Sequence, residues 1–127
     1  MRSVDTNVLV RLVVRDDADQ VRVAEAFVAH GAWVSQLVLA ETLWVLDSVF
    51  NLTRAQLGMA VEMLLNHRDI TVQDADVVAA ALGHFRKVAA VCFSDCLVLE
   101  IARKAGHLPL ATFDRPLAKL PDVQRLR

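Results

Sequence analysis

The chain of 127 residues is long enough for one folded domain with a substantial apolar core. Hydrophobic residues make up 55% of it and the mean hydropathy is +0.39, yet no apolar run reaches the roughly 18 residues of a membrane-spanning helix. The net charge of −1 argues against a protein that holds nucleic acid by a basic excess, but it leaves room for a basic rim around an acidic site. We expect a single domain over residues 1–127, without a membrane segment or signal peptide and located in the cytoplasm.

Short apolar segments and amphipathic segments alternate along the whole chain. Strands are predicted at residues 3–4, 33–35, 70–72, 108–112 and 123–126. Helices are predicted at residues 7–14, 17–28, 37–50, 53–65, 74–85 and 95–105. Thr53 and Gln56 have the spacing of a capping box at the start of the helix 53–65. Strands that alternate with helices indicate βαβ units, so we predict an α/β fold with a parallel sheet.

The first predicted strand ends in a carboxylate, Asp5, which is followed at once by Thr6 and Asn7. In open parallel α/β sheets, ligands bind outside the carboxyl ends of the strands, and Asp5 belongs to that edge. A capping role for Asp5 or Thr6 at the start of the next helix explains this stretch equally well when it is considered alone. Asp5 is therefore a candidate site residue whose support comes from the rest of the chain.

Glu41 stands among apolar residues in the predicted helix 37–50. Its helical neighbours three and four positions away are all apolar, and they are Leu37, Val38, Trp44 and Val45. A carboxylate on such a face is expected to cost several kcal/mol unless it is paired or binds a cation. Two interpretations stay open: a buried ion pair with an arginine, and a cation site.

Two further acids lie in apolar surroundings. Asp95 begins the predicted helix 95–105, where an N-cap is the alternative interpretation, and Asp114 follows the strand 108–112, where a turn is the alternative. With Asp5 and Glu41 they follow different strands, or belong to the helices after them, so we expect all four at one edge of the sheet. Carboxylate oxygens suit Mg²⁺ or Mn²⁺, and such a cluster supports phosphodiester hydrolysis without a histidine base or a cysteine nucleophile.

Four segments, in this order and at these separations, make the chain resemble a PIN-domain ribonuclease, specifically the VapC-type toxin of bacterial toxin–antitoxin pairs. They are residues 4–9, 39–46, 93–97 and 110–114. The resemblance implies a PIN-like three-layer fold with a five-stranded parallel sheet flanked by helices. It also implies a Mg²⁺- or Mn²⁺-dependent endoribonuclease, a homodimer and a small cognate antitoxin. By motif match, it assigns the catalytic and metal-binding roles to Asp5, Glu41, Asp95 and Asp114, with Asn7 and Thr112 as polar support.

Cysteine usage departs from this family in one place. Many relatives carry an acid three residues before the acid that Asp95 matches, and this chain has Cys92 at that position. The site is therefore expected to hold one metal ion firmly and a second one weakly or only with substrate. Neither Cys92 nor Cys96 has a histidine at metal-ligand spacing, and both are interpreted as thiols of the core. The candidate contacts to RNA phosphates are basic side chains that also suit a solvated surface: Arg11, Arg15, Arg86, Lys87 and Arg115.

Two other functions are compatible with parts of the pattern. A catalytically silent PIN-like module that binds RNA or a protein would keep the fold and lack metal-dependent cleavage. A phospho-acceptor signalling domain also gathers acids at strand ends, but it is expected to have an acidic pair after the first strand, and only Asp5 is present there. The leading hypothesis is a metal-dependent endoribonuclease toxin.

Overall fold

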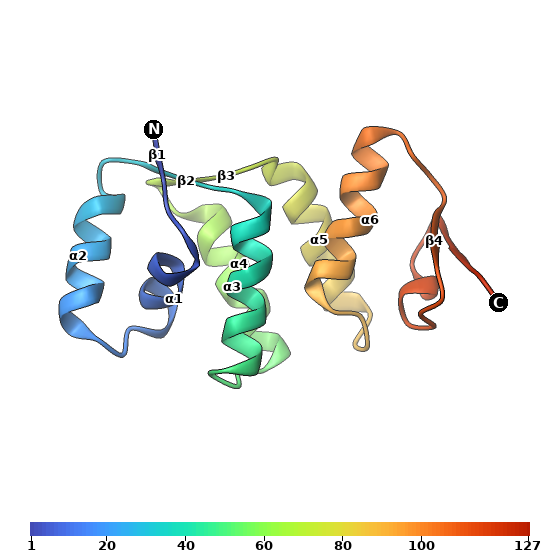
Figure 1. Cartoon of the computed structure of the whole chain (residues 1–127), viewed down its shortest axis with the longest axis horizontal. Coiled ribbons are helices and arrows are strands. Elements are labelled where there is room, and N and C mark those ends of the chain that lie inside the picture. Colours follow the sequence, from blue (N-terminus) through green and yellow to red (C-terminus); the bar gives the residue numbers. More distant parts are fainter. The chain divides into compact units, whose positions relative to one another are not determined.

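A computed structural model describes residues 1–127 as two compact units, an N-terminal unit, Met1–Ala75, and a C-terminal unit, Asp76–Arg127 (Figure 1). The α-helices are α1 (Thr6–Val14), α2 (Ala18–Val28), α3 (Gln36–Ser48), α4 (Arg54–Asn66), α5 (Ala75–Lys87) and α6 (Phe93–Ala105). The strands are β1 (Arg2–Ser3), β2 (Ala32–Val34), β3 (Ile70–Val72), β4 (Leu110–Thr112) and β5 (Val123–Arg125), and a 3₁₀ helix, η1, covers Leu117–Lys119.

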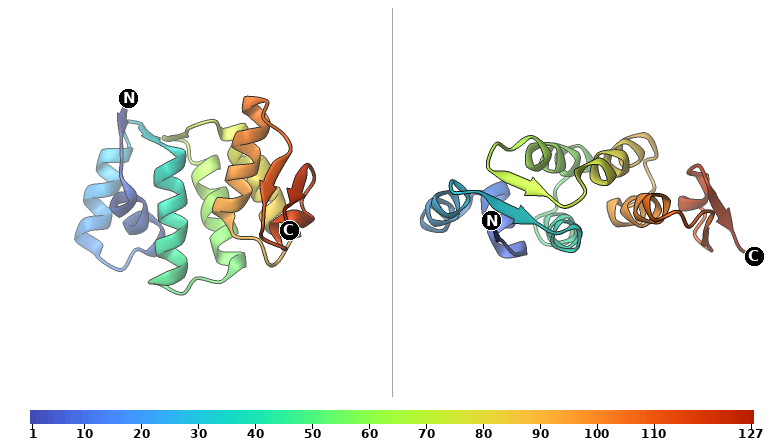
Figure 2. Two further views of the ribbon diagram at one scale, coloured as in Figure 1. Left: turned by 45° about the vertical axis from the view of Figure 1, so that its right-hand side comes forward. Right: turned by 90° about the horizontal axis from the view of Figure 1, so that it is seen from above.

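The N-terminal unit is built on a three-stranded parallel sheet in the order β1-β2-β3. Each parallel pair requires a crossover, which α1 and α2 provide between β1 and β2, and α3 and α4 provide between β2 and β3. Seen from above, α1 and α3 lie on one side of this sheet and α4 lies on the other (Figure 2). The carboxyl ends of β1 and β2 therefore share one edge, from which α1 and α3 begin.

The helices of the N-terminal unit begin where the sequence supplies a side-chain cap. Ser35 accepts a hydrogen bond from the backbone N–H of Val38 at the start of α3. The predicted capping box at α4 is confirmed, because Thr53 and Gln56 exchange hydrogen bonds of 2.9 and 3.2 Å. The side chains that these helices bury form one apolar core, which includes Leu9, Val28, Leu39, Leu46 and Leu64.

The C-terminal unit consists of α5, α6 and a two-stranded parallel sheet of β4 and β5. Phe85 of α5 and Phe93 of α6 pack edge to face, with ring centroids 5.8 Å apart. Gly106 ends α6 with a φ of +83°, a left-handed conformation that suits glycine. The chain then turns into β4, and η1 separates β4 from β5.

The predicted α/β class is confirmed, with parallel strands and flanking helices consistent with a three-layer fold. All five strands are found, each only two or three residues long, and they pair as one group of three and one of two. The assignment of both cysteines to the core is wrong for Cys92, which is exposed, whereas Cys96 is buried. None of the helices is both long enough and apolar enough to span a membrane.

Candidate functional site

Asp5 lies just beyond the carboxyl end of β1 and is the N-cap of α1. Its carboxylate accepts the backbone N–H of Val8 at 3.3 Å, and its backbone is extended. The side chain is exposed, as a residue at the ligand-binding edge of a parallel sheet is expected to be. Capping engages one carboxylate oxygen, so the second oxygen is left for another partner.

Glu41 is brought to the same place by a hydrogen bond between two helices. The hydroxyl of Thr6, the first residue of α1, donates to Oε2 of Glu41 on α3 at 2.9 Å. Because Thr6 directly follows Asp5 in the chain, this bond holds the carboxylate of Glu41 at the start of α1. The N-terminal unit thus brings together two of the four acids that were predicted to form the site.

The expectation that Glu41 sits on a buried face is wrong. Glu41 is exposed, and its helical neighbours Leu37 and Trp44 are 70% and 68% exposed. The helix α3 is apolar on nearly all sides, so its sequence does not reveal which side packs inward. The predicted cost of burying this charge is therefore not incurred, and the buried ion pair with an arginine is absent.

Thr6 is a functional candidate that the sequence reasoning missed. It was considered only as a helix cap, a role that the structure gives to Asp5. The available signal was a hydroxyl side chain directly after the candidate acid, in the first turn of the helix. Asn7, which was predicted as polar support, is exposed in the same turn.

In the C-terminal unit, Asp95 is the third residue of α6 and lies in its first turn. The N-cap is Cys92, whose side chain makes no capping hydrogen bond and instead lies 3.3 Å from the hydroxyl of Ser94. The N-cap interpretation of Asp95 is therefore wrong, although the helix dipole still favours a carboxylate at this position. The side chain of Asp95 is half-exposed and makes no ion pair.

Asp114 and Thr112 form a local motif after β4. The hydroxyl of Thr112, the last residue of β4, accepts the backbone N–H of Asp114 at 3.0 Å. Oδ2 of Asp114 accepts the N–H of Leu117 at 2.9 Å and so helps to begin η1. The turn interpretation of Asp114 is correct in geometry, and it leaves an exposed carboxylate that Thr112 supports through the backbone.

The four candidate acids share one electrostatic property: none is in an ion pair. Most other acids of the chain with resolved partners face cations, as Asp16 faces Arg11 and Glu25 faces Arg15. Carboxylates without a cationic partner offer oxygen ligands that suit a hard cation such as Mg²⁺ or Mn²⁺. The donor set therefore fits such an ion in chemistry, although neither unit brings three Asp, Glu, His or Cys side chains together as a metal-binding group.

The candidate RNA-contact residues differ in whether they form an ion pair with an acid of the chain. Arg11 is paired with Asp16, and Arg15 is paired with Glu25 at 2.6 Å, so both guanidinium groups are engaged within the N-terminal unit. Arg86 and Lys87 lie in the last turn of α5, and Arg115 is exposed directly after Asp114. Of these, Lys87 and Arg115 make no ion pair.

A parallel α/β fold with exposed acids beyond the carboxyl ends of its strands defines a class of proteins that place catalytic groups at a sheet edge. The family model of the PIN domain matches residues 3–123, through both units, and the chain belongs to this family. The PIN domain is a nuclease-type fold whose members are generally RNA-binding, metal-dependent nucleases. The comparisons with curated proteins and with solved structures found no match.

Proposed function

We propose that this chain is an endoribonuclease that depends on Mg²⁺ or Mn²⁺ and acts in the cytoplasm as the toxin of a toxin–antitoxin pair. Membership of the PIN domain family supports a nuclease. The observation that carries the assignment is the hydrogen bond from Thr6 to Glu41, which holds a second unpaired carboxylate at the helix start that Asp5 caps. Glu41 has no cationic partner in the chain, so its carboxylate is free to meet an external cation.

The residues have separate roles in the proposed reaction. Asp5, Glu41, Asp95 and Asp114 would hold a divalent ion, which would supply positive charge for the phosphoryl oxygens and lower the pKa of a bound water. Thr6 orients Glu41, and Thr112 fixes the backbone of Asp114. Asn7 lies in the turn that follows Asp5 and is a polar contact for substrate or water. With the charge of the reaction balanced by an ion, the chain needs no histidine general base.

Cleavage of RNA by the purified protein tests this function. With Mn²⁺ we expect internal cuts in a single-stranded RNA, and with EDTA we expect none. A protein that binds the RNA but never cleaves it with Mn²⁺ or Mg²⁺ would instead be the catalytically silent module. A small DNA-binding protein encoded next to this chain would support the toxin assignment independently.

The exposed side of α3 supports the proposed homodimer. Leu37, Trp44 and Val49 are large apolar side chains that are 70%, 68% and 60% exposed on or directly after this helix. A two-fold interface would bury the same surface on both subunits. Light scattering at micromolar concentration is expected to give the mass of a dimer, and a monomer would count directly against this part of the proposal.

A groove between α1 and α2 supports the proposed antitoxin partner. It has a volume of about 450 Å³ and is lined by apolar side chains that include Val8, Val23 and Phe27. We propose that an apolar segment of the antitoxin lies in this groove while a cation of the antitoxin approaches Asp5. Titration of the antitoxin with and without Mg²⁺ checks this arrangement, because competition lowers its affinity when Mg²⁺ is present, whereas equal affinities would exclude it.

A further inference from the structure

Arg125 is placed beside a candidate site residue by the pairing of the last two strands. It is the final residue of β5, and its Cα partner across the parallel pair is Thr112, the final residue of β4. Neighbouring strands lie about 5 Å apart, and in-register residues of a parallel pair project to the same face. Arg125 therefore lies on the face that carries the hydroxyl of Thr112.

The same hydroxyl is hydrogen-bonded to the backbone of the candidate acid Asp114. Thr112 accepts the backbone N–H of Asp114, which keeps the start of the following turn at the end of β4. The backbone N–H of Leu126 donates to the carbonyl of Thr112 at 2.7 Å, so the pairing of the two strands extends one residue beyond Arg125. Arg125 is thus the strand neighbour of Thr112, which lies two residues before Asp114.

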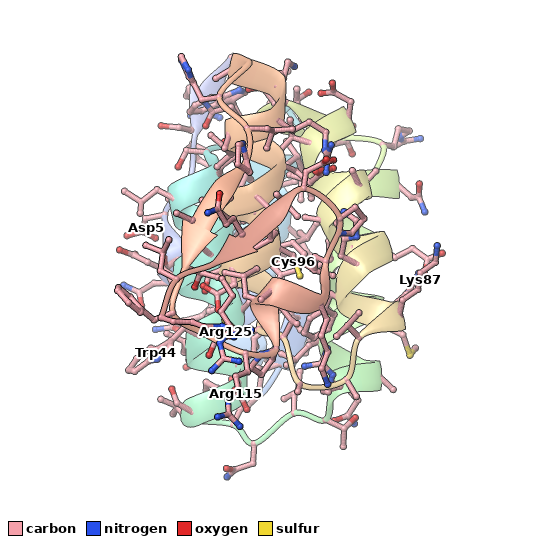
Figure 3. All side chains as sticks on the ribbon, turned by 90° about the vertical axis from the view of Figure 1, so that its right-hand side faces the viewer. Asp5, Trp44, Lys87, Cys96, Arg115 and Arg125 are labelled. Carbon is pink, nitrogen blue, oxygen red and sulfur yellow. The ribbon has the colours of Figure 1, made fainter.

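The guanidinium group of Arg125 is exposed and makes no ion pair, and the same is true of Arg115, the residue after Asp114 (Figure 3). This differs from Arg103 in the same unit, whose guanidinium contacts Glu100 at 2.8 Å and Asp122 at 2.6 Å. Arg115 and Arg125 make no ion pair and are named here the basic surface. Arg115 directly follows Asp114 in the chain, and Arg125 pairs in register with Thr112. Such a surface attracts an anion in spite of the near-neutral charge of the whole chain.

We propose that Arg125, together with Arg115, binds the backbone phosphates of RNA next to Asp114 and so positions the strand for cleavage. The inference rests on the proposed function and extends it, because it names the element that holds the substrate backbone. A guanidinium presents a rigid pair of donors that matches phosphate oxygens. Phosphate contacts set the position of the nucleic acid and carry no sequence information, so this surface acts on any single-stranded RNA.

The test is the salt dependence of RNA binding, which does not require cleavage. A fluorescein-labelled single-stranded RNA of mixed sequence is titrated in EDTA at several salt concentrations, and affinity is followed by fluorescence anisotropy. Arg125→Gln is expected to weaken binding about threefold to tenfold and to lower the slope of log K against log salt by roughly 0.7, the change for one lost phosphate contact on a single strand. Arg125→Lys keeps the charge and is expected to keep the slope.

Arg68→Gln is the control, since Arg68 is an almost fully exposed arginine of the N-terminal unit that faces Asp69 at 3.6 Å and belongs to no candidate site. It is expected to leave the affinity for RNA and the salt slope unchanged. Binding is compared only among variants whose melting temperature equals that of the wild-type protein. An unchanged slope in Arg125→Gln, with a wild-type protein that binds and cleaves RNA, would overturn this inference and leave the proposed nuclease intact. A wild-type protein that binds RNA with the expected Arg125 effect but cleaves nothing would support the phosphate surface and overturn the proposed activity.

Discussion

Two glutamates on helices, one in each unit, show how differently the same side chain is used. Glu41 on α3 is exposed and accepts one hydrogen bond, from the neutral hydroxyl of Thr6. Glu100 on α6 is buried, with 7% of its surface exposed, and faces two basic side chains, Arg103 and His84. The carboxylate of Glu100 is paired with basic side chains of its own unit and stabilises the fold. The carboxylate of Glu41 has no basic partner and can meet an external cation.

The cluster around Glu100 joins α6 to the turn before β5 in the C-terminal unit. Arg103 donates to Glu100 at 2.8 Å, to Asp122 at 2.6 Å and to the carbonyl of Pro121 at 3.4 Å. The hydrogen bond to Asp122, followed by the one to Glu100, raises the pKa of Arg103 above its usual value. The cluster therefore fastens α6 to the turn before β5 by a permanently charged group, and it bears on stability rather than on chemistry.

The largest effect that we expect is on cleavage. Asp95→Asn removes one negative charge with little change of shape, so the fold is retained while the proposed metal site loses a ligand. We predict at least about a hundredfold loss of Mn²⁺-dependent RNA cleavage, equivalent to about 2.7 kcal/mol in the activation free energy. The comparison variant is Asp47→Asn, an exposed acid of α3 that is expected to retain full activity. Full activity in a folded Asp95→Asn protein would refute the site assignment.

The second prediction compares how much each of the two glutamates contributes to the free energy of unfolding in the absence of metal. Glu100→Gln replaces charge-assisted hydrogen bonds in a buried cluster, and we expect the free energy of unfolding to fall by about 1.5–3 kcal/mol. Glu41→Gln lies at an exposed position and is expected to change it by less than about 0.5 kcal/mol. Urea denaturation of both variants in EDTA measures the difference. Equal losses would mean that Glu41 is also a structural residue.

The third prediction concerns the donor that distinguishes Glu41. Thr6→Val keeps the shape of the side chain and removes its hydroxyl, so Glu41 loses its orientation, and we expect Mn²⁺ to bind about twofold to tenfold more weakly. Thr6→Ser restores the hydroxyl and is expected to restore the affinity. Isothermal titration with Mn²⁺ gives both values, with Glu41→Gln as the reference for complete loss of this ligand. If Glu41→Gln weakens binding and Thr6→Val does not, the orienting role of Thr6 is excluded.

The smallest effect that we expect is on the pH dependence of stability, and it comes from an exposed ion pair of the C-terminal unit. Lys104 donates to both carboxylate oxygens of Asp76, and this hydrogen bond lowers the pKa of Asp76 below its ordinary value of 3.8. A depressed folded-state pKa stabilises the fold above the unfolded pKa, and this contribution is lost as the pH falls through the folded value. We therefore expect Asp76→Asn to lower the stability slightly above about pH 4, where this contribution is present, and to flatten the loss of stability below that pH. Acid titration of the two proteins by circular dichroism checks this.

Local sequence patterns predicted most of the elements, because caps and periodicity act over a few residues. Asp5 and the Thr53–Gln56 capping box were both recognised in this way. The sequence could not show that the apolar face around Glu41 is turned to solvent, since α3 is apolar on nearly every side. Glu100 was missed because its burial is set by the packing of α6 against α5, where its partner His84 lies 16 positions earlier in the chain. The pairing of β4 with β5, which places Arg125, is also set by long-range contacts that short strands do not encode.

The exposure of Trp44 has a practical consequence for optical measurements. The chain contains two tryptophans and no tyrosine, and Trp33 lies within the sheet on β2, half-buried. Trp44 is 68% exposed and lies three positions after Glu41, close to one helical turn away. Its emission is therefore expected at long wavelength and open to quenching by acrylamide. A protein that covers α3 would shift this emission to the blue, whereas a divalent ion held by Glu41 alone would leave the quenching largely unchanged, so one intrinsic fluorophore separates the two events.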